Sequence, residues 1–274
     1  MPHTEVNGAR LFFELTGTDG LALVFVHGSW VDHHNWDAVV PLLDGFQVLT
    51  YDRRGHGDSE RTAPSADLEQ DARDLLALVN SLGLTHCHLV GNSFGALVAL
   101  RAATLRPDLW WSLLLHEPPA FGILLETEGD RIWRAEVEAG LDEVRELLRS
   151  GRWEEGARLF LESNALGDGE WDRMPQSARE TWVANAPAFL DQIANLDWAT
   201  PDRSALAYLP MRVLLSKGNR SPAWQQRVVS LLAPGGLVTV GGAGHAPQLT
   251  HPEAYANLLT LFVESVTQPA ATPE

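Results

Sequence analysis

The segment LVGNSFGA places Ser93 between two glycines, in the pattern Gly91-Asn92-Ser93-Phe94-Gly95. An apolar run precedes it and a helix-forming apolar segment follows, so we expect a tight turn from a strand into a helix. Such a turn strains the backbone of its central residue, and the flanking glycines let neighbouring segments pass without a Cβ clash. The hydroxyl would lie at a helix N-terminus, which favours developing negative charge. The pattern predicts a nucleophilic serine; the alternative is a glycine-rich structural turn.

The segment VFVHGSW ends a second apolar run and supplies the donor that acyl transfer needs beside the nucleophile. A tetrahedral oxyanion is stabilised when two backbone N–H groups point at it. We expect these donors to be the N–H groups of Ser29 and Phe94. Trp30 is expected to line the substrate pocket.

The general base is expected in the glycine-rich segment VGGAGHAPQLTHPEAY, late in the chain, where His245 can lie over the sheet edge beside Ser93. The remaining histidines are assigned other roles. We expect a structural role for His27 and for His56 of YDRRGHGDS, a solvated or pocket-rim position for His33 and His34, and a surface position for His251.

Six apolar runs define the elements that must position these residues: 21–28, 45–52, 86–93, 110–117, 211–218 and 235–242. Helical patterns lie between several of them; the segment 67–83 spaces its apolar residues along one face and ends at Gly83, a plausible C-cap. Strands that alternate with helices indicate an α/β fold with a mostly parallel sheet. The first strands instead favour a hairpin that turns at Asn7-Gly8.

The alternation stops between about residues 120 and 205, where charged helical segments replace the strands. We interpret this stretch as a helical insertion between two strands of the sheet. Five of the ten tryptophans fall in it: Trp133, Trp153, Trp171, Trp182 and Trp198. They could enclose an apolar substrate or pack the interior of the insertion.

The composition excludes several classes of partner. The chain of 274 residues has 20 basic and 36 acidic residues and a formal net charge of -16, which disfavours nucleic acid and anionic membranes. Its one cysteine, Cys87, lies in an apolar run and is expected to be a buried filler. The N-terminal residues do not resemble a secretory signal, and no apolar run could span a membrane. We expect a cytoplasmic protein that acts on a small molecule.

The motifs HGSW, DRRGHGDS, GNSFG and GAGH, in this order and spacing, resemble the α/β-hydrolase superfamily over essentially the whole chain. The resemblance implies the α/β-hydrolase fold, in which helices flank a mostly parallel central sheet and a helical cap is inserted after the sixth strand. The core would comprise residues 1–119 and 206–268, the cap residues 120–205, and a disordered tail residues 269–274. The resemblance also implies Ser-acid-His catalysis without a cofactor or metal. A serine at this position suits acyl transfer, whereas family members with an aspartate nucleophile form an alkyl ester.

The catalytic acid is missing from its usual place. In most members of the family it follows the strand that corresponds to MRVLLSKG, but residues 218–221 here read GNRS. Asn219 could hold an imidazole but carries no charge. The preceding strand ends in HEPP, and the resemblance places Glu117 beside the nucleophile strand, where some members carry the acid. We therefore predict the triad Ser93, His245 and Glu117.

Alternatives remain open. Glu117 could instead cap a helix or face solvent, the acid could come from Asp191 or Asp197 of the cap, or a Ser-His pair could act without an acid. The predicted function is hydrolysis of a small or medium, largely apolar ester, lactone or thioester. The other candidates are a C–C bond hydrolase with the same triad and a non-catalytic ligand receptor. The oligomeric state is expected to be monomer or homodimer.

Overall fold

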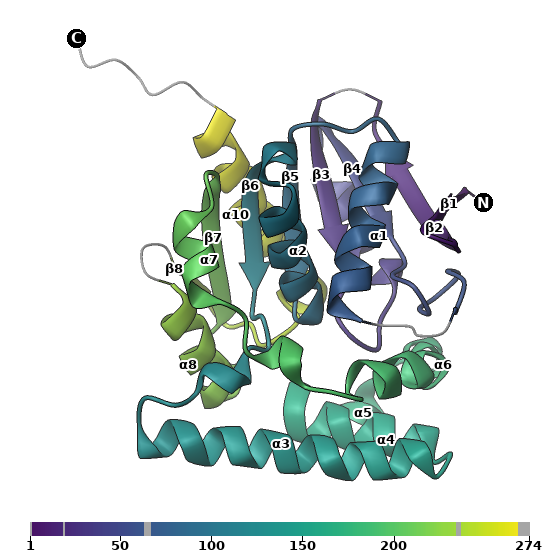
Figure 1. Ribbon diagram of the computed structural model, residues 1–274, viewed down its shortest axis with the longest axis vertical. Helices are drawn as coiled ribbons and strands as arrows, with labels where there is room; N and C mark the ends of the chain where they lie inside the picture. The colour runs from purple at the N-terminus through teal and green to yellow at the C-terminus, as the bar shows by residue number, and fades with distance from the viewer. Residues whose placement is uncertain (1, 19, 63–66, 234–236, 268–274) are drawn as a thin grey trace.

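The computed structural model describes residues 2–18, 20–62, 67–233 and 237–267. The predicted tail at 269–274 lies outside these ranges. Helices flank a single sheet of eight strands in the described residues (Figure 1). The strands are β1 (His3–Val6), β2 (Ala9–Thr16), β3 (Leu21–Val26), β4 (Phe46–Tyr51), β5 (Cys87–Asn92), β6 (Trp110–His116), β7 (Arg212–Gly218) and β8 (Leu237–Val240).

The strand order is β1-β2-β4-β3-β5-β6-β7-β8. Strand β2 pairs antiparallel with both β1 and β4, and every other pairing is parallel. This confirms the predicted mostly parallel sheet and the N-terminal hairpin. The hairpin turns at Asn7 and Gly8, whose φ angles of 46° and 76° match the positive values that a two-residue turn requires.

Alternating residues of the central strands supply two separate hydrophobic clusters, one on each face of the sheet. Val24 and Val26 of β3 join the cluster that contains helices α1 (Leu68–Ser81) and α2 (Phe94–Leu105). The intervening Phe25 joins the cluster on the other face, which α10 (Pro252–Thr267) covers. Burial on both faces explains why these strands are continuous apolar runs rather than alternating patterns.

A layer of helices lies across the carboxyl ends of the parallel strands (Figure 1). The layer comprises α3 (Glu128–Arg149), α4 (Trp153–Phe160), the π-helical turn η5 (Leu161–Ala165), α5 (Glu170–Arg173) and α6 (Gln176–Gln192). The chain then returns through η6 (Asp197–Ala199) and α7 (Arg203–Tyr208) to β7, and α8 (Ala223–Leu232) and α9 (Pro247–Thr250) follow. The predicted helical insertion is therefore present between β6 and β7.

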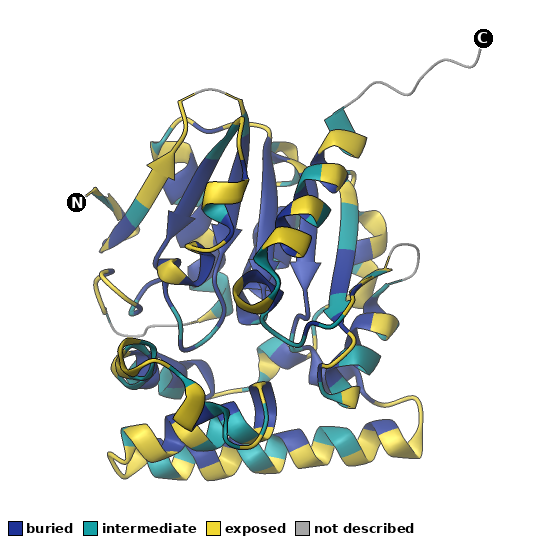
Figure 2. Cartoon of the chain, turned by 180° about the vertical axis from the view of Figure 1, so that it is seen from behind, coloured by how far each residue is buried: buried dark blue, intermediate teal, exposed yellow. Residues whose placement is uncertain are grey.

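The helical layer packs onto the sheet through apolar side chains. Val137 and Leu141 of α3 belong to the same buried cluster as Phe94 and Leu115 of the core. The outer side of α3 is exposed (Figure 2). Because one hydrophobic cluster runs through both parts, the exact division into a core and a cap stays a prediction.

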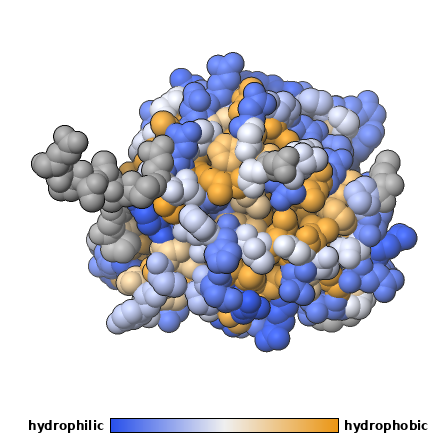
Figure 3. All heavy atoms as spheres, turned by 90° about the horizontal axis from the view of Figure 1, so that it is seen from above, coloured by the Kyte–Doolittle hydropathy of each residue, from blue (hydrophilic) through white to orange (hydrophobic). Residues whose placement is uncertain are grey.

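The end of the molecule opposite the helical layer shows hydrophobic side chains among hydrophilic ones (Figure 3). Trp111, at the start of β6, is 40% exposed. The two ends of the parallel strands therefore differ, because the helical layer covers only their carboxyl end.

Among the described residues, no helix combines the length and apolar character that crossing a membrane requires.

Candidate active site

Ser93 lies in the tight turn between β5 and α2. Its φ and ψ angles of 56° and -127° belong to a backbone conformation that non-glycine residues rarely adopt. A Cβ on Gly91 would lie 2.5 Å from the carbonyl oxygen of Gly95, and a Cβ on Gly95 would overlap the carbonyl oxygen of Val26. The two glycines are therefore required by close backbone contact. Ser93 is partly exposed, as its predicted role as a nucleophile requires.

The chain after β3 passes close to this turn. A Cβ on Gly28 would lie only 3.0 Å from Cβ of Ser93, so the following residue, Ser29, lies beside the nucleophile. Within the described residues, neither the N–H of Ser29 nor that of Phe94 has a hydrogen-bond acceptor. Both amides are available to an oxyanion, although their role in catalysis stays a prediction.

Glu117 directly follows β6 and has a positive φ of 45°. The residue is 1% exposed, and both carboxylate oxygens have hydrogen-bond partners. Oε2 lies 2.7 Å from Nδ1 of His245, and Oε1 accepts a hydrogen bond of 2.8 Å from the N–H of Gly218. This rigid setting fixes the imidazole in one orientation.

The charge state of Glu117 follows from its neighbours. Burial by itself raises the pKa of this carboxyl, but the hydrogen bond and charge of His245, helped by His116 and Ser221, outweigh burial and lower the pKa to about 2. The carboxylate is therefore ionised at neutral pH. It can stabilise an imidazolium on His245 during proton transfer.

Two hydrogen bonds to the backbone hold the loop that carries His245 over the sheet edge. Asn92 donates a 3.2 Å hydrogen bond to the carbonyl oxygen of His245, next to the nucleophile turn. Asn219 accepts a 2.8 Å hydrogen bond from the N–H of Gly242 in the same loop. Asn219, at the position where the family usually carries its acid, thus fixes the loop and not the imidazole.

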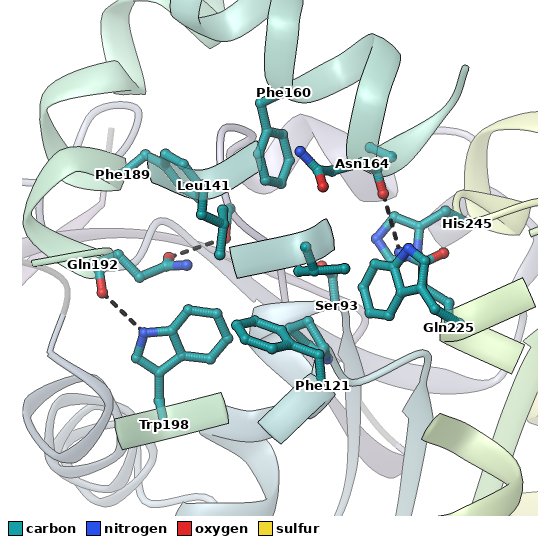
Figure 4. Close-up of a pocket in the computed structure, with 15 residues that line it drawn as sticks. Ser93, Phe121, Leu141, Phe160, Asn164, Phe189, Gln192, Trp198, Gln225 and His245 are labelled. Atoms are coloured by element: carbon teal, nitrogen blue, oxygen red, sulfur yellow. Dashed lines mark hydrogen bonds between the residues drawn. The ribbon is translucent and has the colours of Figure 1, made fainter. Parts of the chain in front are cut away.

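Ser93 and His245 line one cavity of about 440 Å³, a volume that includes space open to solvent (Figure 4). Within the described residues, no hydrogen bond joins the Ser93 hydroxyl to His245. Catalytic hydrogen bonds of this kind often tighten only when the substrate is bound. The structure therefore brings the three residues of the predicted triad, Ser93, His245 and Glu117, together at one site, with Ser93 and His245 at the cavity wall.

The rest of the cavity wall is mainly apolar, and none of its side chains carries a permanent charge. It is lined by Ser29, Pro119, Phe121, Val137, Leu141, Phe160, Asn164, Ala165, Phe189, Gln192, Trp198, Trp224 and Gln225. Most of these residues come from the helical layer and from the segment after β6. Of these residues, only Ser29 and Trp198 could be proposed from the sequence, because which face of each helix points inward depends on tertiary packing.

Trp30 does not lie where we expected it. It is fully buried and does not line the cavity; its ring packs on Phe189, with ring centroids 4.3 Å apart, and stacks on Trp182 at 5.5 Å. Trp30 also has a positive φ of 69°, which turns its side chain into the hydrophobic cluster. Trp30 therefore packs behind the cavity wall, against Phe189, which lines the cavity.

Of the other histidines considered above, His27, His33 and His56 are buried, and His34 is exposed. His27 is buried and accepts a 2.9 Å hydrogen bond from the N–H of Arg53, which confirms its structural role. His56 is also buried and contacts Arg53, as expected. The expectation for His33 is wrong: it is neither solvated nor at the pocket rim, but buried with Nδ1 2.8 Å from Asp52. His34 is exposed, as expected.

One group of side chains in the described residues has the spacing of metal ligands. The ligand atoms of Asp32, His33 and Asp52 lie within 4.8 Å of one another and are buried. The carboxylates already accept hydrogen bonds from the N–H groups of His33, His34 and Asp58. The cluster is internally satisfied, and we assign it no ligand.

The alternative acids lie elsewhere. Asp191 forms an ion pair with Arg61 at 3.1 Å, and Asp197 begins the short helix η6. Among the described residues, the carboxylate that contacts His245 is that of Glu117.

Comparisons with known proteins show which family the chain resembles. A family model described as the alpha/beta hydrolase family matches residues 23–258. The chain is 27% identical over 261 residues to the sn-1-specific diacylglycerol lipase ABHD11 of Mus musculus, covering 88% of this chain and 80% of that protein. A thermophilic esterase from Thermogutta terrifontis superposes with a TM-score of 0.75 at 26% identity, covering 97% of both chains.

A third similarity is local. The chain is 39% identical over 120 residues to the dihydrolipoyllysine-residue acetyltransferase component of the acetoin cleaving system of Pseudomonas putida. The match covers 43% of this chain and 32% of that protein, so it concerns one part of a longer relative.

Proposed function

Because the chain belongs to the alpha/beta hydrolase family, we propose that it is a serine hydrolase that forms an acyl-enzyme with a small or medium, largely apolar ester, lactone or thioester. One observation carries the proposal: His245, whose Nδ1 lies 2.7 Å from Oε2 of Glu117, lines the same cavity as Ser93. The similarity to an esterase and to a lipase supports ester chemistry.

In the proposed acylation, Ser93 Oγ attacks the substrate carbonyl carbon while its proton passes to Nε2 of His245. Glu117 stabilises the imidazolium that forms, and the N–H groups of Ser29 and Phe94 bind the oxyanion. The tetrahedral intermediate collapses, the bond to the leaving group breaks, and His245 protonates the departing alcohol or thiol.

Deacylation repeats the same proton transfers with water. His245 removes a proton from a water molecule, whose oxygen attacks the acyl carbon. Collapse of the second intermediate breaks the bond to Ser93 Oγ, which regains its proton from His245. The product acid leaves, and no external oxidant, reductant or cofactor is required.

The cavity supports an uncharged, largely apolar substrate. Apolar side chains dominate its wall, and a charged substrate group would lose its hydration without gaining a partner of opposite charge. The C–C hydrolase alternative acts on vinylogous diketones, which require a polar pocket, and the mainly apolar wall offers little to such substrates. The cavity thus favours ester-type substrates over that alternative.

Hydrolysis of 4-nitrophenyl esters tests the proposal. We expect a rapid burst of 4-nitrophenolate equal to the enzyme concentration, because acylation releases the phenol before water clears the acyl group. Ser93→Ala should abolish the burst. Ser230→Ala, at an exposed position on α8, is the matched control and should leave it intact. A folded wild-type protein without turnover would instead indicate a ligand receptor.

A further inference from the structure

Two polar atoms in the cavity wall lack a hydrogen-bond partner. Nδ2 of Asn164 and Oε1 of Gln225 are buried and unpaired within the described part of the chain. The two residues are 8% and 4% exposed, and both line the cavity that contains Ser93. By contrast, the other lining amide is paired: Gln192 accepts a 3.0 Å hydrogen bond from the Ser29 hydroxyl.

The two residues come from different parts of the molecule. Asn164 lies in the π-helical turn η5 (Leu161–Ala165) of the helical layer, and Gln225 lies on α8 beside the sheet. Nε2 of Gln225 lies 3.5 Å from the main-chain oxygen of Asn164 and donates to it. Since its amide nitrogen is engaged there, Gln225 is left with a free acceptor. Asn164 projects beside Phe160 into the cavity (Figure 4).

The local structure around Asn164 is specialised. Single π-helical turns inside helices are rare and occur frequently at functional sites. Gly140 of α3 faces the Asn164 amide, and a Cβ there would lie 3.4 Å from Nδ2. Gly140 therefore lies directly against the amide.

An unpaired buried donor and an unpaired buried acceptor are unfavourable, because each has lost its hydrogen bonds to bulk water. A ligand group that supplies one acceptor and one donor would satisfy both. The unpaired donor and the unpaired acceptor are on two different side chains. A secondary amide likewise carries its acceptor and its donor on two atoms, whereas a hydroxyl carries both on one oxygen.

We propose that Asn164 and Gln225 form an amide-binding subsite that selects substrates with a secondary amide away from the bond that is hydrolysed. Asn164 donates to the amide carbonyl oxygen, and Gln225 accepts from the amide N–H. This inference rests on the proposed serine hydrolase function and narrows its substrate class. Because one residue is in the helical layer and the other on α8, the substrate amide would also bridge the two parts.

The test replaces one CH₂–CH₂ unit of an ester with NH–CO at successive positions. One series carries the amide in the acyl chain of 4-nitrophenyl esters, and a second carries it in the alcohol chain of butanoate esters, followed by acid release. Each kcat/KM is divided by that of the all-carbon ester and corrected for hydroxide-catalysed hydrolysis. We expect a preference of about 10-fold or more at one position, because a site with buried polar groups discriminates against analogues that leave them unpaired.

Substitution identifies the residues responsible. Asn164→Leu and Gln225→Leu should each reduce that preference towards the value at the other positions. The matched controls are Asn80→Leu and Gln176→Leu, at exposed positions on α1 and α6, which should retain it. The readout is the ratio of the kcat/KM values of two substrates measured on one protein, so a partial loss of folded enzyme leaves it unchanged.

Binding to Ser93→Ala protein separates this inference from the proposed function. Calorimetry on the same pairs of esters should give a lower Kd for the amide ester at the preferred position, even if wild-type protein hydrolysed no ester. Equal Kd values and a flat kcat/KM series would overturn the subsite. A stronger preference for hydroxyl-bearing esters at the same position would overturn the choice of an amide.

Discussion

Two imidazole–carboxylate pairs with a buried carboxylate, among the described residues, have almost the same geometry. Nδ1 of His245 lies 2.7 Å from Glu117, and Nδ1 of His33 lies 2.8 Å from Asp52. Both carboxylates are buried. The pairs differ in what surrounds the imidazole: His245 lines the cavity with Ser93, whereas His33 packs on Phe12 with ring centroids 4.5 Å apart and does not line the cavity.

This difference shows that a short contact between a histidine and a carboxylate does not define a catalytic site. The pair around His33 connects the segment after β3 to the DRRGHGDS loop, and the Asp52 carboxylate also accepts a 2.8 Å hydrogen bond from the N–H of Asp58. It stabilises a loop. In the pair around His245, the imidazole lines the same cavity as Ser93, so we expect that only this pair supports catalysis.

The largest effect on kcat/KM is expected from substitution of His245, compared with substitution of an exposed histidine. His245→Gln should lower kcat/KM by about 10⁴-fold or more, because the serine loses its base. The matched control is His34→Gln, a side chain that is 65% exposed, which should hydrolyse esters like wild type. Comparable kcat/KM values for the two variants in an ester assay would contradict the assignment.

Breaking the second pair should affect stability and leave catalysis intact. Asp52→Asn removes a buried charge that accepts hydrogen bonds from His33 and Asp58, and we expect a loss of about 2–4 kcal/mol in the free energy of unfolding. Denaturant titration measures this loss. The folded fraction should keep a kcat/KM close to that of wild type; a selective loss of activity would assign the pair a catalytic role.

The His33 pair should also give the stability a pH dependence. Burial lowers the pKa of His33, but Asp52 and Asp32 outweigh burial and raise it above the ordinary value of 6.5. Protonated His33 then contributes stability below pH 6.5, which is lost as the pH rises through the raised pKa. We expect His33→Gln to remove this part of the dependence of the free energy of unfolding on pH. Denaturant midpoints measured from pH 5 to 9 report this dependence. An unchanged slope would show that other groups cause it.

The smallest effect is expected at Asn219. Asn219→Ala removes the 2.8 Å hydrogen bond that holds the His245 loop, so kcat/KM should fall by only about 10-fold, the effect of roughly one hydrogen bond. Asn80→Ala, at an exposed position on α1, is the control for the same substitution elsewhere. A complete loss of activity in Asn219→Ala would indicate that Asn219 orients the imidazole directly.

Local patterns made most of the fold predictable. The central strands are buried on both faces and are therefore continuous apolar runs, and Asn7-Gly8 satisfies the positive φ angles of its hairpin. The resemblance to the α/β-hydrolase superfamily is confirmed by the match over residues 23–258. The contact of Glu117 with His245 was predictable because both residues follow strands of a sheet whose order the family implies.

The cavity wall was not predictable in the same way. Asn164 and Gln225 lie 61 positions apart and meet only because the helical layer packs against α8. The backbone turn at Trp30, with its positive φ, directs an aromatic side chain away from the cavity although its neighbour Ser29 lines it. His33 contains no local signal that distinguishes a buried ion pair from an exposed side chain. Tertiary contacts decide each of these features.

The rate at which a fluorophosphonate labels Ser93 tests most directly whether Glu117 activates the serine, because labelling needs no knowledge of the substrate. Wild type should be labelled rapidly, with the adduct on Ser93 by peptide mass spectrometry. Glu117→Gln should be labelled about 10³-fold more slowly, since an amide does not stabilise the imidazolium, whereas folded Asp52→Asn should match wild type. Labelling of Glu117→Gln at the wild-type rate would contradict the account.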